Sequence, residues 1–350
     1  MSQKNPTTSG INKNWKPLND FSDAESVAYY INGVKENNRT VLSEAITIVE
    51  SKTKNTDFIL RLLDGVYDPL KETLRIGISG SPGAGKSTFI NVLGDFLTKQ
   101  GKKVAVLAVD PSSEITKGSI LGDKTRMYKL IQNPDVYIRP TPSSSFLGGV
   151  AASTKESILL CEAAGYDIIL IETVGVGQSE TLVKNMVDLF CLILLPGAGD
   201  ELQGIKKGIV EMSDLFIINK ADSGRELLAK ESKKFYKNAI QLSHSASQKK
   251  KDVLICSSLE QKGIKKVWES LKNLTQFRKE NYSFDDNRVN QNQKWLIGKK
   301  EAITIQKLSS LMQQIIDPEK DDSKQIFKSL IAYNEKMDLR VNEIKNRLDD

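Results

Sequence analysis

The chain has 350 residues, of which 50 are Lys or Arg and 44 are Asp or Glu, giving a formal net charge of +6. Its 39% hydrophobic and 27% charged residues are typical of a folded globular protein and exclude a disordered or fibrous one. Charges of both signs are interspersed along the chain, so nucleic-acid binding is not expected.

The three cysteines, Cys161, Cys191 and Cys256, lie in or beside apolar stretches, which is typical of buried, reduced thiols. The chain has one histidine and no Cys-x-x-Cys motif, so a metal site built from soft ligands is not expected. The first 15 residues lack the apolar segment of a signal peptide, and no run of about 18 apolar residues occurs. We therefore expect a protein without a membrane span that is cytoplasmic, or that lies in the matrix of an organelle if a leader is involved.

Residues 1–73 are predicted to form a disordered tail and a helical N-terminal extension. The tail covers about residues 1–19 and is rich in Lys, Asn, Ser and Thr. Apolar residues then recur at helical spacing from Asp20 to Tyr67, with a break at Asn38–Thr40.

Between residues 74 and 275, short apolar runs alternate with helical segments. The runs are rich in Val, Ile and Leu, as in strands that are buried on both faces of a sheet. They are Arg75–Ser79, Val104–Val109, Val136–Ile138, Ile168–Glu172, Leu189–Leu195, Leu215–Asn219 and Val253–Cys256. Helices such as Ser87–Lys99 and Thr154–Ala163 separate them. This alternation predicts an α/β fold with a doubly wound, mostly parallel sheet.

Residues 276–350 turn polar and then become helical again. We expect a polar linker, Arg278–Lys294, followed by amphipathic helix that includes Ile303, Leu308 and Leu339. A helical arm of this kind is a candidate for dimerisation, so a homodimer is expected.

A phosphate-binding loop follows the first strand and opens a helix. Its glycines let successive backbone N–H groups point at phosphate oxygens, and the helix N-terminus adds a positive dipole. In such loops the lysine reaches the β- and γ-phosphates and the hydroxyl after it binds Mg²⁺. The loop residues are Gly80, Ser81, Pro82, Gly83, Ala84, Gly85, Lys86, Ser87 and Thr88. A P-loop NTPase is therefore predicted.

A second loop indicates which base is bound. The strand Leu215–Asn219 ends in Asn219-Lys220-Ala221-Asp222, whose carboxylate can accept both the ring N–H and the exocyclic amine of guanine. Adenine does not offer this pair of donors. After the next strand, Ser257, Ser258 and Leu259 resemble the Ser-Ala-x element that supports the base in GTPases, with Ser258 in place of alanine. Together the two loops favour GTP and GDP.

Three acidic residues are candidates for sensing the γ-phosphate or holding Mg²⁺. Asp110 and Glu172 each come at the carboxyl end of a strand, where open α/β sheets bind their ligands. Asp123 lies in the loop Gly118–Arg126 and is a candidate for positioning water or a metal-bound water. With Lys86, these three are the candidate catalytic residues.

Seven segments resemble the MeaB/ArgK family of GTPases, which are associated with adenosylcobalamin-dependent methylmalonyl-CoA mutase. The resemblance spans about Phe58 to Trp268. The longest strings, ETVGVGQSE and PGAGDELQGIKKG, are more specific than the phosphate loop. The segments are Gly80–Thr88, Val109–Ser113, Gly118–Met127, Ile138–Pro140, Glu172–Glu180, Pro196–Gly208 and Asn219–Asp222.

The resemblance implies a GTP-hydrolysing chaperone that gates cofactor loading into the mutase and protects or reactivates it. By similarity, Ser87, Asp110, Asp123 and Glu172 surround Mg²⁺ and the attacking water, and which carboxylate ligates the metal directly stays open. The segment from Pro196 to Lys206 resembles a switch that transmits the nucleotide state to the partner. Its candidate residues are Gly199, Asp200, Gln203 and Lys206.

Two other functions remain as alternatives. The first is an ATP-dependent kinase linked to transport of basic amino acids, an older label of the same family. A guanine-recognition loop at Asn219–Asp222 argues against it. The second is a metal-insertion GTPase, which the lack of a Cys/His cluster argues against.

Overall fold

The structure of the protein is a computed structural model. It describes residues 24–51, 56–110, 128–142, 147–173, 179–197, 207–242, 251–281 and 283–313. The chain divides into two compact units, Met1–Trp295 and Leu296–Asp350. The expected tail at residues 1–19 and the helical stretch around Leu339 lie outside the described residues.

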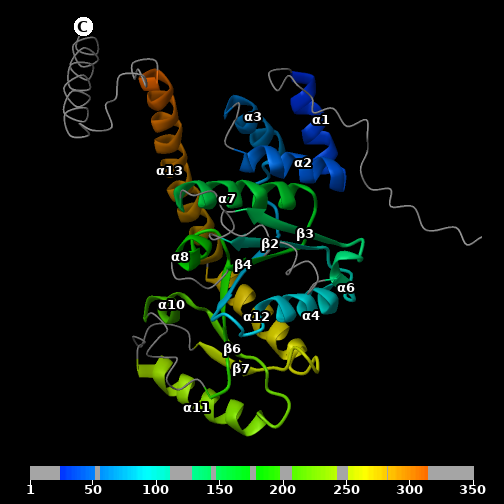
Figure 1. Ribbon diagram of the computed structural model, residues 1–350, viewed down its shortest axis with the longest axis vertical. Coiled ribbons are helices and arrows are strands. Elements are labelled where there is room, and N and C mark those ends of the chain that lie inside the picture. Colours follow the sequence, from blue (N-terminus) through cyan, green and yellow to red (C-terminus); the bar gives the residue numbers. More distant parts are fainter. Residues whose placement is uncertain are drawn as a thin grey trace, which may run out of the picture. The chain divides into compact units, whose positions relative to one another are not determined.

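In the described part of the chain, seven strands form one sheet in the order β3-β2-β4-β1-β5-β6-β7 (Figure 1). Every neighbouring pair is parallel, so the predicted doubly wound parallel sheet is confirmed. The strands are β1 (Leu74–Gly80), β2 (Val104–Asp110), β3 (Val136–Pro142), β4 (Ile168–Thr173), β5 (Leu189–Leu194), β6 (Leu215–Ile218) and β7 (Asp252–Ile255).

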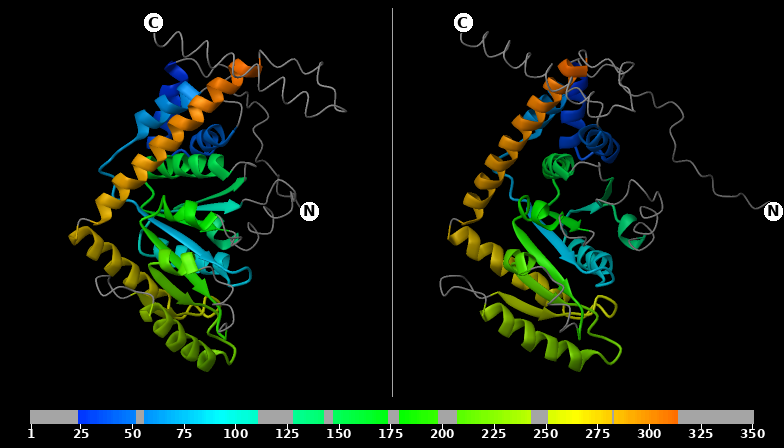
Figure 2. Two further views of the ribbon diagram at one scale, coloured as in Figure 1. Left: turned by 90° about the vertical axis from the view of Figure 1, so that its left-hand side faces the viewer. Right: turned by 60° about the vertical axis from the view of Figure 1, so that its left-hand side comes forward.

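Helices cover both faces of this sheet (Figure 1, Figure 2). On one face lie α4 (Lys86–Thr98), α6 (Tyr128–Ile131) and α12 (Ile264–Glu280). On the other face lie α7 (Leu147–Ala163), α8 (Ser179–Lys184), α10 (Lys207–Met212) and α11 (Glu226–Leu242). Strand residues alternate between the two layers, because Val104 and Val106 join one buried cluster and Ala105 and Leu107 join the other. Because both faces of the sheet are covered, most residues of the strands are apolar on both sides of the alternation.

The N-terminal extension consists of α1 (Ala24–Lys35), α2 (Arg39–Glu50) and α3 (Thr56–Val66). Their buried residues share one hydrophobic cluster with α7 and the sheet. The expected break at Asn38–Thr40 holds the N-cap of α2, where Asn38 Oδ1 accepts from Thr40 N at 3.1 Å and Val41 N at 3.3 Å. Such a cap stabilises a helix by about 1 kcal/mol. The division into segments 1–73, 74–275 and 276–350 stays a prediction.

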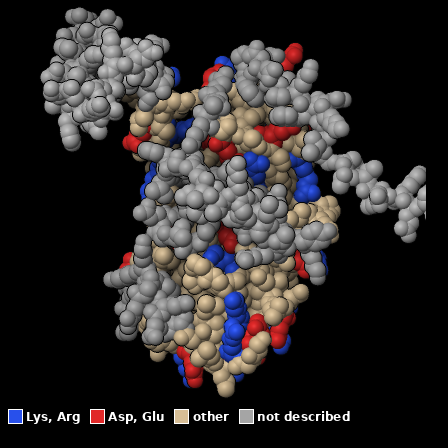
Figure 3. All heavy atoms as spheres, viewed as in Figure 1, with Lys and Arg blue, Asp and Glu red and all other residues tan. Residues whose placement is uncertain are grey.

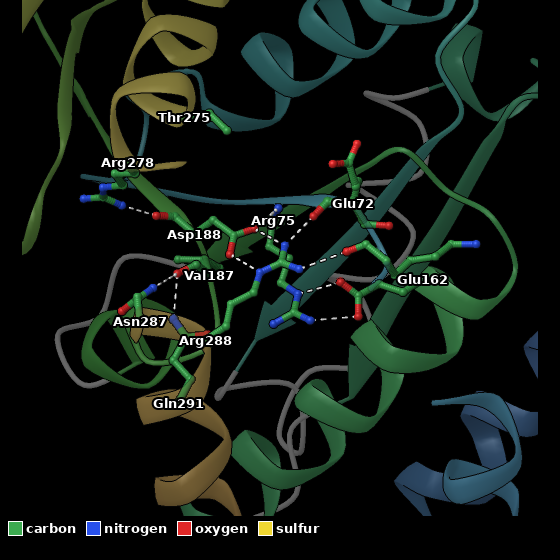
Figure 4. A network of polar contacts seen from close by, with 12 residues as sticks. Glu72, Arg75, Glu162, Val187, Asp188, Thr275, Arg278, Asn287, Arg288 and Gln291 are labelled. Carbon is green, nitrogen blue, oxygen red and sulfur yellow. Dashed lines mark hydrogen bonds and ion pairs between the residues drawn. The ribbon is translucent and has the colours of Figure 1, made fainter. Parts of the chain in front are cut away.

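The expected polar linker at Arg278–Lys294 is wrong, because α12 runs to Glu280 and α13 (Ser283–Gln313) starts three residues later. Its polar side chains bond to the amino end of β5 (Figure 4). Arg288 Nε donates to Asp188 Oδ1 at 2.8 Å, and Gln291 Nε2 donates to Val187 O at 2.8 Å. The polar residues that indicated a linker therefore lie in the first turns of a helix, where they bond to the residues just before β5.

A charge cluster lies at the amino ends of β1 and β5 (Figure 4). Arg75 donates to both oxygens of Glu162, and its backbone N donates to Asp188 Oδ2 at 2.8 Å. Lys155 of α7 faces the same groups and is 2% exposed. Burial, followed by the positive charge of Arg75, lowers the pKa of Lys155 to about 7.

The three cysteines are buried and free of disulfide bonds, as predicted. Burial raises the pKa of the Cys161 and Cys191 thiols, and that of Cys256 to about 12. On the described surface of Figure 3, acidic and basic side chains are interspersed. Among the described helices, none has the length and apolar character that a membrane span requires.

Candidate functional site

The phosphate loop connects β1, in the middle of the sheet, to α4. Gly85 is the residue before α4 and has a φ of 89°, in the left-handed region. A Cβ atom at this position would lie 2.6 Å from Asn219 Nδ2, closer than real Cβ contacts. Glycine is therefore required at residue 85 both by the turn and by the close approach of a second loop.

Lys86 is the first residue of α4, and only 8% of its surface is exposed. Its Nζ atom donates to Gly80 O at 2.8 Å and to Ser81 O at 3.2 Å. These bonds hold the ammonium group beside the backbone of the loop. That is where a loop of this type binds phosphate oxygens.

Ser87 and Glu172 bring two oxygen groups together at the carboxyl edge of the sheet. The Ser87 hydroxyl donates to Glu172 Oε1 at 3.0 Å, and Glu172 is 7% exposed. Glu172 lies near the end of β4, which pairs with β1 on one side and β2 on the other. Hydroxyl and carboxylate oxygens are the ligands that Mg²⁺ prefers.

Asn219 joins the loop after β6 to the phosphate loop. Its Nδ2 donates to Ala84 O at 3.0 Å, and its Oδ1 accepts from Ser258 N at 3.0 Å and Ser258 Oγ at 2.8 Å. Asn219 is 1% exposed and Ser258 is 3% exposed. The amide of Asn219 thus links three loops that are distant along the chain: the phosphate loop, the loop after β6 and the loop after β7.

Asp222 is 6% exposed and is oriented by the loop after β7. Ser257 Oγ donates to Asp222 Oδ2 and accepts a hydrogen bond from Glu260 N at 3.0 Å. Leu259, which precedes Glu260 in this loop, is 74% exposed. Lys220 has a φ of 58°, and its side chain approaches the phosphate loop at Gly85. The loop at Asn219–Asp222 therefore lies next to the phosphate loop and holds the Asp222 carboxylate in a fixed orientation.

Several predicted site residues have no described position. Asp123, Gly199, Asp200, Gln203 and Lys206 lie outside the described residues, and the backbone of Asp110 ends β2 without a described side chain. Within the described ranges, there is no group of three or more His, Cys, Asp or Glu that could hold a metal ion. A Mg²⁺ ion bound mainly by phosphate oxygens and water needs no such group.

One contact was missed from the sequence. Gly197 N, at the start of the segment Pro196–Lys206, donates to Ser232 Oγ of α11 at 2.8 Å. Leu228 of the same helix packs against Gly197. Neither Ser232 nor Leu228 belongs to a motif, and both lie within an ordinary amphipathic helix, so the sequence carries no signal for this contact.

Comparison with known proteins identifies the family. Residues 42–313 match the family model described as methylmalonyl Co-A mutase-associated GTPase MeaB. The chain belongs to the MeaB family. It is 45% identical over 256 residues to the GTPase ArgK of Escherichia coli (strain K12), a match that covers 73% of this chain and 76% of that relative.

The chain is also similar to an animal protein and to a protein of known structure. The chain is 47% identical over 252 residues to the mitochondrial methylmalonic aciduria type A homolog of Mus musculus, covering 69% of this chain and 61% of that one. The crystal structure of a protein named LAO/AO transport system kinase superposes with a TM-score of 0.68 at 31% identity, covering 90% of this chain and 99% of that one. This MeaB-family chain is a GTPase with a P-loop fold that binds guanine nucleotide, and its family is associated with methylmalonyl-CoA mutase.

Proposed function

We propose that the protein hydrolyses GTP with Mg²⁺ and is a chaperone of adenosylcobalamin-dependent methylmalonyl-CoA mutase. In this role it gates cofactor loading and protects or reactivates the mutase. The observation that carries the proposal is the match to the mutase-associated GTPase family over residues 42–313. The relative in Mus musculus, named for methylmalonic aciduria, supports the same client.

In the proposed site, residues 80–88 bind the phosphates and Lys86 neutralises their charge. Asp222 accepts hydrogen bonds from the ring N–H and the exocyclic amine of guanine. The hydrogen bond from Ser257 supports this role, because it orients the carboxylate before the base arrives. Lys220, Ser258 and Leu259 complete the wall around the base.

The residues at the carboxyl edge fit a magnesium ion. Ser87 Oγ and Glu172 Oε1 lie 3.0 Å apart, and both are hard oxygen ligands. Asp110 and Asp123 are the other proposed carboxylates. Bound Mg²⁺ supplies positive charge that stabilises the phosphates during hydrolysis. Glu172 also orients the Ser87 hydroxyl, and the three carboxylates are proposed to position the attacking water.

The segment Pro196–Lys206 is the proposed contact with the mutase, through Gly199, Asp200, Gln203 and Lys206. Its first residues are held by α11, since Gly197 N donates to Ser232 Oγ. A segment that is anchored at its start and follows a strand next to the nucleotide is suited to pass on the nucleotide state. The homodimer is proposed to form through the C-terminal helical arm.

The decisive experiment is GTP hydrolysis by the purified protein with and without methylmalonyl-CoA mutase from the same organism. We expect a rate with GTP that the mutase raises, and no hydrolysis of ATP. Lys86→Ala is the control, because it should lose nucleotide binding in both conditions. A GTPase rate that the mutase leaves unchanged would contradict the chaperone role and leave the GTPase itself intact.

The name of the superposed protein, a transport system kinase, supports a second candidate, an ATP-dependent kinase linked to transport of basic amino acids. The two proposals differ in nucleotide. Affinities for GDP and ADP, measured by competition, separate them. Binding of ADP that is tighter than binding of GDP would favour the kinase and contradict the guanine site at Asp222.

A further inference from the structure

The side chain of Asn219 makes four hydrogen bonds, which link the loop after β6 to the loop after β7 and to the phosphate loop. Its Oδ1 accepts from the backbone N and the hydroxyl of Ser258, at 3.0 and 2.8 Å, and from Cys256 Sγ at 3.4 Å. Its Nδ2 donates to Ala84 O at 3.0 Å. All of these atoms are buried, so each bond forms out of contact with water.

The backbone bond from residue 258 would exist with any side chain, whereas the hydroxyl bond depends on serine. The element Ser257-Ser258-Leu259 departs from the Ser-Ala-x pattern at this residue, and alanine has no donor to offer. The Ser258 hydroxyl therefore adds a hydrogen bond to Asn219 that an alanine in the loop after β7 would not make. The thiol of Cys256, a weak donor, does not replace it.

The amide of Asn219 has little freedom to adjust. Its Nδ2 lies so close to Gly85 that a Cβ atom there would approach it to 2.6 Å. If the amide rotated, Ala84 O would lose its donor and the phosphate loop would lose its link to the base loop. A nucleotide that contacts both loops is released when the loops part.

We propose that Ser258 is a positioning residue that fixes the Asn219 amide and thereby slows the release of guanine nucleotide. This inference rests on the proposed binding of guanine at Asp222, in the site that the loops of Asn219 and Ser258 form. A buried hydrogen bond contributes about 0.5–1.5 kcal/mol, which corresponds to a change of about two- to tenfold in a rate or binding constant.

The first test compares Ser258→Ala with wild type in the dissociation of GDP that carries a fluorescent N-methylanthraniloyl group. We expect dissociation to become about two- to tenfold faster, with little change in association. Ser270→Ala is the matched control. Ser270 is also buried, and its hydroxyl donates to Asp252 Oδ2 at 3.0 Å, at the amino end of β7. An equal effect of both variants would overturn the proposal.

A double-mutant cycle distinguishes positioning from a general loss of stability. In an Asn219→Ala background, Ser258→Ala should have no further effect on GDP affinity, because its partner is gone. Additive losses of affinity would overturn the proposal. Ser258→Cys, which keeps the shape and weakens the donor, should give an intermediate rate. If wild type itself fails to bind GDP, the guanine site is wrong, which is a different result from unchanged release in Ser258→Ala.

Discussion

Arg75 and Glu162 form a bidentate ion pair, with hydrogen bonds of 2.6 and 2.8 Å between side chains that are each 6% exposed. Removing one partner of a buried pair leaves an uncompensated charge, so Glu162→Ala should lower the free energy of unfolding by about 3–5 kcal/mol. The double variant Arg75→Met/Glu162→Met should recover most of this loss. Urea unfolding measures both, and a double variant no more stable than Glu162→Ala would contradict the argument.

The lowered pKa of Lys155 should make the free energy of unfolding depend on pH. The unfolded chain keeps this lysine protonated up to about its ordinary pKa of 10.5, whereas the folded protein does so only below about 7. Between these values the unfolded state binds more protons, so stability rises with pH. The loss of stability caused by burying Lys155 is absent above pH 10.5, grows as the pH falls, and is complete below about pH 7.

Lys155→Met should therefore stabilise the protein at pH 7, by about 1–3 kcal/mol, and by less at pH 9. Urea unfolding at the two pH values checks this. Lys265→Met, at an exposed residue of α12, is the control and should leave the difference between the two pH values as it is in wild type. If Lys155→Met also leaves that difference unchanged, the buried ammonium is not its source.

Asp222→Asn should change the preferred base from guanine to xanthine. The carboxylate accepts two N–H groups, whereas an amide offers one donor and one acceptor, which matches the 2-oxo group and ring N–H of xanthine. We expect GDP affinity to fall by about 100-fold and XDP affinity to rise. Asp252→Asn, at the amino end of β7, controls for the loss of a charge. Tight GDP binding by Asp222→Asn would show that the base lies elsewhere.

Glu172→Gln should separate hydrolysis from binding. The amide keeps an oxygen for the Ser87 hydroxyl but loses the charge proposed to act on Mg²⁺ and water. We expect the single-turnover rate of phosphate release from GTP to fall about 100-fold, while GDP affinity changes much less. Glu269→Gln, on the exposed side of α12, serves as the reference. Equal rates in the two variants would remove Glu172 from the proposed site.

The strands and the two nucleotide loops were predictable because their signals are local. Apolar runs marked all seven strands of the described sheet within a few residues. The largest miss was β3, expected to end at Ile138 but continuing to Pro142. Proline is tolerated there because β3 is at the edge of the sheet and pairs only with β2.

Contacts between distant segments were not predictable. The role of Arg288 depends on its meeting Asp188, 100 residues earlier, and its polarity alone indicated a linker. The Asn219 side chain was recognised by its motif, yet its bonds to Ala84 and Ser258 follow only from how the three loops pack. Periodicity reports which residues are buried, and it does not report which buried polar groups meet.

Because Cys161, Cys191 and Cys256 are buried, the folded native chain should react little with thiol-reactive dyes. A cysteine introduced at the surface would be the accessible thiol of the folded protein. Leu227 is 73% exposed and precedes Leu228, whose side chain packs against Gly197. A dye on Leu227→Cys would stand beside the start of the proposed partner segment. Its fluorescence would then follow that segment in real time through a cycle of GTP binding, hydrolysis and release.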